Sequence, residues 1–150
     1  MTRPRGFSLI ELVVVLVLVA TLAGLAAAVI GQALPGRQLR STAAQVAGDL
    51  RFTRAQAIAT GQAQEFTLDV AGKRWTGAGK RQGDVPADID LDVTTARDPQ
   101  SESEVAIVRF FPDGAATGGR IVLRYDEAAW RVDVAWLTGE VRLTRGAGQP

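Results

Sequence analysis

The residues with the clearest chemical potential stand near the start of the chain, where one acid precedes a long apolar run. Glu11 is followed by residues 12–30, a run of 19 residues without a charged side chain. A helix rises about 1.5 Å per residue, so this run spans roughly 28 Å, close to the ~30 Å hydrocarbon core of a bilayer. Arg3 and Arg5 precede it. The pattern predicts a membrane-spanning helix whose N-terminal side faces the cytoplasm.

A carboxylate at the edge of such a helix is costly unless it has a partner. Cleavage of the chain after Gly6 would give Phe7 a cationic amine, four residues from Glu11. In a stack of parallel helices, the carboxylate of one subunit could then neutralise the amine of its neighbour. Such a pair is strong at low dielectric, provided that both charges are buried together. The spacing therefore favours assembly in register.

The segment Gly6-Phe7-Ser8-Leu9-Ile10-Glu11, followed by the apolar run, resembles the class III signal of type IV pilins and type II secretion pseudopilins. The resemblance implies that a prepilin peptidase cuts between Gly6 and Phe7 and methylates the new N-terminal Phe7. It also implies that Glu11 is the assembly glutamate.

Two simpler interpretations of the N-terminus compete with this one. A secretory signal could end at the small residues 26–28, which would leave a chain that starts at Val29. An uncleaved anchor would need only the apolar run. Neither interpretation explains why Glu11 stands at the start of the run.

Composition excludes several kinds of chemistry. The 150 residues contain no cysteine and no histidine, which rules out disulfides, thiolate nucleophiles, Ser-His pairs and the usual zinc ligands. From Pro35 onward 15 basic side chains balance 15 acidic ones. A neutral domain gives no electrostatic reason to expect nucleic acid or anionic lipid as the main partner.

A second helical segment is expected after Pro35, which should kink or interrupt the first. It should run from Arg37 to about Thr60, with Gly61 as its stop. One apolar stripe at helical spacing is expected to pack on the protein's own sheet, whereas Arg40, Gln45, Asp49 and Arg51 lie off it. The stripe consists of Leu39, Ala43, Val46, Leu50 and Ala57.

Beyond Gly61 the apolar residues alternate, as is typical of half-buried strands. Phe66, Leu68 and Val70 share one side of the first strand. Six or seven strands are expected, at residues 64–70, around Trp75, and at 89–93, 104–111, 120–125, 129–136 and 140–144. Turns are predicted at Pro112-Asp113-Gly114 and at Thr138-Gly139. The polar segments 77–86 and 96–103 are expected to be exposed loops and candidate contact surfaces.

These patterns predict an α+β fold, in which a long N-terminal helix packs on an antiparallel β-sheet domain. The expected organisation is a leader (1–6), a hydrophobic transmembrane and assembly helix (7–34), an amphipathic continuation (35–61) and a periplasmic β-rich domain (62–150).

The globular part carries a second resemblance. Phe111-Pro112-Asp113-Gly114, the hairpin with Thr138-Gly139 within residues 132–141, and Arg54-x-x-Ala57-Ile58 resemble motifs of the H-type minor pseudopilins and related pilins, the GspH/FimT family. This implies a subunit of the type II secretion pseudopilus near the filament tip, which helps to drive folded exoproteins through the outer-membrane secretin. Implied partners are the major and other minor pseudopilins, prepilin peptidase, the inner-membrane platform and exoprotein cargo.

Other motifs do not support an enzyme, a cofactor or a metal site. Residues 76–80 look like a phosphate loop, but Arg74 stands where its first glycine should be and Arg81 follows the lysine. Asp88, Asp90 and Asp92 have the first spacing of a calcium loop, yet the glycine and the bidentate acid are missing. No acid pair stands out in an apolar setting.

The alternative function is that of a FimT-like minor type IV pilin that binds DNA in natural transformation. That role calls for a basic, flexible C-terminal segment. The tail contains Arg142 and Arg145, but Glu140 lies among them and residues 146–150 are uncharged. The sequence therefore favours the secretion subunit.

Overall fold

A computed structural model describes residues 9–95 and 105–147 of the chain, and of residues 25–35 and 147 it describes the backbone alone. The chain divides into two compact units, residues 1–35 and residues 36–150.

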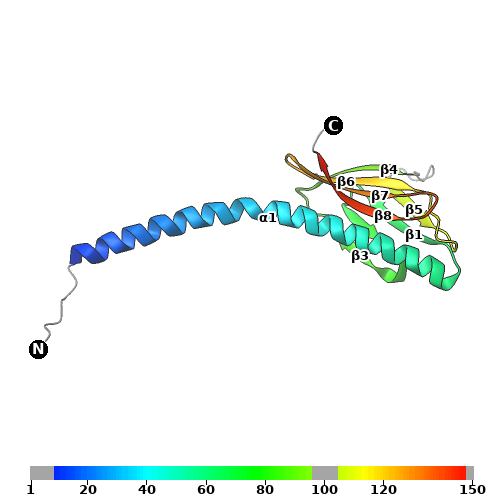
Figure 1. The fold of residues 1–150 in the computed structure, drawn as a ribbon, viewed down its shortest axis with the longest axis horizontal. Coiled ribbons are helices and arrows are strands. Elements are labelled where there is room, and N and C mark those ends of the chain that lie inside the picture. Colours follow the sequence, from blue (N-terminus) through cyan, green and yellow to red (C-terminus); the bar gives the residue numbers. More distant parts are fainter. Residues whose placement is uncertain (1–8, 96–104, 148–150) are drawn as a thin grey trace, which may run out of the picture. The chain divides into compact units, whose positions relative to one another are not determined.

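Helix α1 (Leu9–Thr60) begins in the first unit and continues into the second (Figure 1). It includes Pro35 without a break, so the interruption expected there is wrong. Proline removes one N–H donor and costs about 3 kcal/mol in a helix interior, which the hydrogen bonds of the flanking turns can offset. Within the described residues, no helix combines the length and the hydropathy that a membrane span requires.

The end of α1 is as predicted. The helix stops at Thr60, and Gly61 follows with a φ of +64°, the left-handed conformation that commonly terminates helices. All five residues of the apolar stripe are at most 1% exposed. The stripe therefore packs on the protein's own sheets, as the sequence indicated.

Beyond α1, the described residues of the second unit include two four-stranded antiparallel sheets. The first has the order β3-β2-β1-β5 and the second the order β4-β6-β7-β8. The strands are β1 (Gln64–Asp69), β2 (Arg74–Thr76), β3 (Gln82–Asp84), β4 (Asp90–Thr95), β5 (Val105–Phe110), β6 (Gly119–Tyr125), β7 (Ala128–Val134) and β8 (Val141–Ala147). The α+β fold predicted from the sequence is confirmed.

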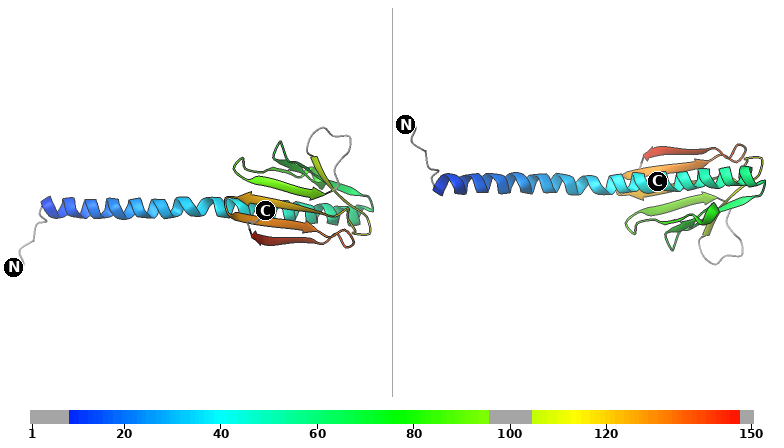
Figure 2. Two further views of the ribbon diagram at one scale, coloured as in Figure 1. Left: turned by 90° about the horizontal axis from the view of Figure 1, so that it is seen from above. Right: turned by 90° about the horizontal axis from the view of Figure 1, so that it is seen from below.

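One hydrophobic core joins the helix to both sheets. Leu50 of α1, Phe66 and Phe110 of the first sheet, and Leu123 and Val132 of the second are all fully buried in it. Figure 2 shows the two sheets side by side, with the second half of α1 lying across both. Each sheet therefore buries its apolar face against the same helix, α1.

The strand count and one loop require correction. The described residues contain eight strands rather than six or seven, because residues 77–86, predicted to be an exposed loop, contain a 3-10 turn η1 (Ala78–Lys80) and strand β3. Strand β3 has no apolar alternation since Gly83 lies against the ring of Trp75, where a Cβ would overlap the indole. The other predicted loop, residues 96–103, lies outside the described residues.

Candidate functional site

The predicted leader site is described only in part. Gly6 and Phe7 lie outside the described residues, whereas Glu11 lies in the first turn of α1. The side chains of residues 9–24 are exposed, including Leu9 at 81% and Ile10 at 72%. An apolar helix surface of this length calls for an apolar environment that the described part of the chain does not provide. The roles of Gly6, Phe7 and Glu11 remain predictions.

The three motifs of the globular part meet at one place, around the side chain of Arg54. Its Nε donates a hydrogen bond of 3.0 Å to the carbonyl oxygen of Gly114, sixty residues away. A Cβ at Gly139 would lie 2.9 Å from the same Nε and would overlap the Gly114 oxygen. Arg54 therefore ties the end of α1 to the turn after β5 and to the turn between β7 and β8. We call this contact the Arg54 junction (Arg54, Gly114, Gly139).

Each turn at the junction has its own hydrogen bonds. The Gly114 N–H donates to the carbonyl of Phe111 at 2.9 Å, which closes a reverse turn through Pro112 and Asp113. The Asp113 carboxylate accepts from the N–H of Ala115 at 3.0 Å, an Asx turn. The predicted turn at Pro112-Asp113-Gly114 is confirmed.

The predicted turn at Thr138-Gly139 is confirmed as well. The Gly139 N–H donates to the carbonyl of Ala135 at 2.8 Å, and the Glu140 N–H lies 3.3 Å from the Thr138 hydroxyl, which accepts. Gly114 and Gly139 have φ values of +88° and +62°. Any side chain is strained in this left-handed region, so both motifs need glycine where the sequence has it.

One ion pair lies beside the junction. Glu140 receives two hydrogen bonds from Arg142, at 2.9 and 2.7 Å. The bonded Arg142 guanidinium lowers the pKa of Glu140, and the positive charge of Arg54 adds a smaller lowering. Because the pair is fully exposed, it contributes little to stability. Its effect is to keep both charges in place beside the turn.

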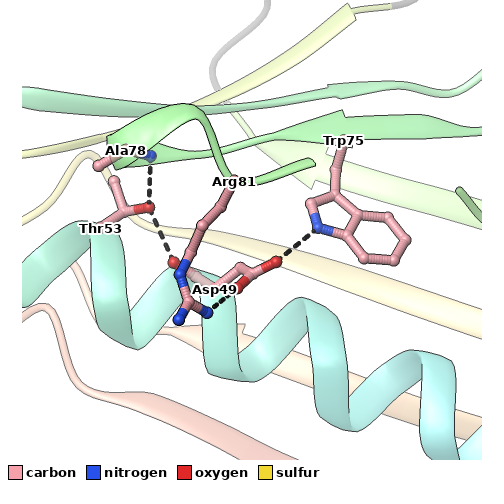
Figure 3. A network of polar contacts seen from close by, with 5 residues as sticks. All are labelled: Asp49, Thr53, Trp75, Ala78 and Arg81. Carbon is pink, nitrogen blue, oxygen red and sulfur yellow. Dashed lines mark hydrogen bonds and ion pairs between the residues drawn. The ribbon is translucent and has the colours of Figure 1, made fainter. Parts of the chain in front are cut away.

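A second polar network fastens the β2–β3 hairpin to α1 (Figure 3). The carboxylate of Asp49 accepts from the indole N–H of Trp75 at 2.9 Å and pairs with Arg81 at 2.7 Å. The fully buried Thr53 hydroxyl donates to the Asp49 carbonyl at 2.8 Å and accepts from the Ala78 N–H at 3.2 Å. Every polar atom named here has a partner, so the network locks the hairpin to the helix.

Sequence reasoning assigned no role to Asp49, Thr53 or Arg81. Asp49 was placed only off the apolar stripe. The available signal was that Asp49 and Thr53 stand four residues apart, and therefore on one face of the helix. Their partners lie more than twenty residues away in the sequence, which no local pattern shows.

Replacing Asp49 with alanine should lower the free energy of unfolding by about 1–3 kcal/mol, because Trp75, which is 2% exposed, would keep a buried N–H without an acceptor. Asp49→Asn retains an acceptor oxygen and should cost less than about 1 kcal/mol, since it removes only the pair with the half-exposed Arg81. Urea denaturation of the full chain in detergent measures both variants. Equal losses would show that the indole bond is not the important contact.

The motifs set aside in the sequence have ordinary structural roles. Residues 78–80 form the η1 turn, in which Gly79 has a φ of +66°, so the segment that resembles a phosphate loop is a tight turn. Asp90 and Asp92 are exposed on β4, and Asp92 lies 3.4 Å from Arg124. The described residues contain no group of three or more carboxylate, cysteine or histidine side chains that could hold a metal ion.

Comparison with known structures defines the class of protein. The chain is similar in fold to the minor pseudopilin EpsH from the type 2 secretion system of Vibrio cholerae, with a TM-score of 0.58 and 17% identity over 72% of this chain and 97% of that one. It is also similar to the type IV minor pilin FimU of Pseudomonas aeruginosa, with a TM-score of 0.55 and 16% identity over 72% and 89%. A pilin-like fold is thus shown.

Sequence comparisons identify the family. A family model described as Type II transport protein GspH matches residues 42–139, and a model of the prokaryotic N-terminal methylation motif matches residues 1–27. The chain is 47% identical, over 138 residues, to the Type II secretion system protein H of Xanthomonas campestris pv. campestris. The aligned region covers 92% of this chain and 82% of the relative. The chain therefore belongs to the GspH family, as its motifs predicted.

Proposed function

We propose that this chain is a minor pseudopilin subunit of a type II secretion pseudopilus, anchored in the inner membrane by the apolar part of α1 through residues 12–30. The observation that carries the proposal is that one chain combines the methylation motif over residues 1–27 with the GspH match over residues 42–139. In this proposal the β-domain lies in the periplasm. The function is structural rather than enzymatic.

The finer role follows from the family resemblance. The subunit would lie near the filament tip, between the other minor pseudopilins and the major one, and would be assembled by the inner-membrane platform. The filament would then help to push folded exoproteins through the secretin. Glu11 would supply the charge that holds the subunit in register, and the two sheets would present surfaces to neighbours.

DNA uptake is the less favoured function. On the outer face of the second sheet, Arg120 lies 2.7 Å from Asp133, and Arg142 lies 2.7 Å from Glu140. Arginines that are already paired with carboxylates offer little net charge for phosphate binding. The likeness to a type IV minor pilin is one of fold alone.

Cleavage by a prepilin peptidase is the first test of the proposed function. The mature protein from membranes should begin at a methylated Phe7, as read by N-terminal sequencing and mass spectrometry. Gly6→Val should abolish cleavage, because the resemblance places the cut after this glycine, whereas Gly24→Val, which changes a glycine inside the apolar run, should leave it intact. A mature chain that starts at Val29 would contradict the proposal.

A further inference from the structure

Charge is unevenly distributed along α1. Between residues 12 and 48 the sequence contains only two charged side chains, Arg37 and Arg40. Both are exposed, and because they are three residues apart they are neighbours on one side of the helix. The domain from Pro35 onward is neutral as a whole, but the part of α1 that opens the second unit is therefore basic.

A tryptophan and a third arginine lie beside Arg40. The Cζ of Arg40 lies over the ring of Trp130, 5.6 Å from its centroid. Trp130 of β7 stands directly opposite Arg145 of β8, and such cross-strand pairs point to the same face of a sheet. Trp130 packs against the core, so the exposed Arg145 is on the face of the second sheet that packs on α1. We call these residues the arginine cluster (Arg37, Arg40, Trp130, Arg145).

In the part of the chain that the structure describes, no carboxylate pairs with the arginines of the cluster. Asp133 lies three positions beyond the tryptophan and therefore on the opposite face, where it pairs with Arg120 and Arg131. The other nearby acids on this hairpin are Asp126 and Glu127, which are exposed in the turn between β6 and β7. Even if both are counted against the three arginines, the cluster keeps a positive charge.

The remaining charges of α1 have other contacts. Asp49 belongs to the network with the β2–β3 hairpin, and Arg54 belongs to the Arg54 junction. Arg51 donates to the carbonyl of Val141 at 3.0 Å. It is eleven residues beyond Arg40, roughly 16 Å along the helix, which exceeds the Debye length of about 8 Å at physiological ionic strength. The cluster is therefore a separate cationic site.

The length of the chain indicates which anions lie within reach of the cluster. Arg37 follows Ile30, the last residue of the apolar run, by seven positions. This is about 10 Å in a helix and at most about 25 Å in any extended conformation. The headgroup region of a bilayer extends about 5–8 Å beyond the hydrocarbon core. If the run spans the bilayer, the long arginine side chains can reach this region, where tryptophan is also enriched.

The size of the cluster favours an anion to which the chain is already tethered. One arginine near an anionic membrane contributes roughly a fivefold preference, so three contribute about a hundredfold. A free ligand needs about a thousandfold to bind even at millimolar concentration. DNA or phosphate in solution would therefore bind only weakly. Lipid headgroups beside the membrane anchor are present at a high effective concentration and need no such affinity.

We propose that the arginine cluster binds anionic lipid headgroups on the periplasmic side of the inner membrane, and that it holds the globular domain against the bilayer before the subunit enters a filament. This inference rests on the proposed function, because it requires α1 to span that membrane. Entry into a filament then requires the release of these headgroups.

Energy transfer between the domain and the bilayer tests the inference. The full chain contains no cysteine, so Thr144→Cys, at an exposed position of β8, carries a single donor dye, and the acceptor dye is on lipid headgroups. The vesicles contain phosphatidylcholine alone or with one quarter of phosphatidylglycerol. Energy transfer should be at least about twofold higher with phosphatidylglycerol, and high salt should remove the difference. Millimolar inorganic phosphate should lower it no more than sodium chloride of equal ionic strength does.

Substitutions separate the effect of charge from that of folding. Arg37→Gln combined with Arg40→Gln should remove most of the difference between the two vesicles, whereas lysine at both positions should preserve it. The matched control combines Arg74→Gln with Arg109→Gln, which removes two exposed charges from the first sheet, and it should behave as the parent does. Arg37→Gln alone leaves the contact of Arg40 with Trp130 in place and should still reduce the difference.

Several outcomes would overturn the inference. They are equal energy transfer in both vesicles, specific competition by phosphate, no effect of Arg37→Gln, and an equal loss in the control pair or in the lysine pair. If the chain stays in the vesicles but its energy transfer does not depend on phosphatidylglycerol, the inference fails alone. If the chain is not retained by vesicles at all, the proposed membrane anchor fails with it.

Discussion

Replacement of Glu11 with glutamine should reduce the incorporation of this subunit into filaments at least about tenfold. In the proposed assembly, the Glu11 carboxylate neutralises the amine of Phe7 in a neighbouring subunit at low dielectric. Removing one member of a buried ion pair costs about 3–5 kcal/mol, because the other charge is left without compensation, and every 1.4 kcal/mol is about a factor of ten in an equilibrium constant. Glutamine keeps the size of the side chain and removes only its charge.

Incorporation is measured by shearing filaments from cells and determining the amount of this chain relative to the other subunits. The matched control is Glu127→Gln, the same change at an exposed acid in the turn between β6 and β7. The control should assemble as the parent does, and both variants should still be cleaved after Gly6. Equal incorporation of the two variants would show that Glu11 has no role in assembly.

Replacement of Gly139 with alanine should lower the free energy of unfolding by at least about 2 kcal/mol. At its φ of +62° a side chain is strained, and the new Cβ would overlap the carbonyl oxygen of Gly114 and lie 2.9 Å from the Nε of Arg54. These are backbone and well-held atoms, so the β7–β8 turn would have to move away. The Arg54 junction would then open.

Gly48→Ala is the matched control, because it makes the same chemical change in the middle of α1, where a Cβ would meet no atom within 4 Å. It should be neutral or stabilise the protein by about 0.5–1 kcal/mol, since glycine is a poor helix former. Urea denaturation of the full-length proteins in detergent compares the two. Similar effects at both positions would mean that the turn tolerates a side chain and that the junction is loose.

Local patterns in the sequence account for much of the fold. The spacing of Leu39, Ala43 and Val46 predicted the buried face of α1, and Gly61 predicted its end, because both depend on residues within one or two turns. The alternation in β1 and β6 predicted strands for the same reason. Strand β3 was missed because its central residue, Gly83, lies against Trp75, and a glycine contributes nothing to an apolar pattern.

The sequence by itself determined the family, the pilin-like class of fold and the glycines of both turns, since these follow from short motifs and from the period of the apolar residues. Only the tertiary structure placed Arg54, Gly114 and Gly139 in one contact. It alone also showed that the Asp49 carboxylate accepts hydrogen bonds from Trp75 and Arg81. The hydrogen-bonded partners Asp49 and Trp75 are 26 residues apart in the sequence, and Arg54 and Gly114 are 60 apart. Contacts at such separations depend on how the helix packs across the two sheets, and no local spacing encodes that packing.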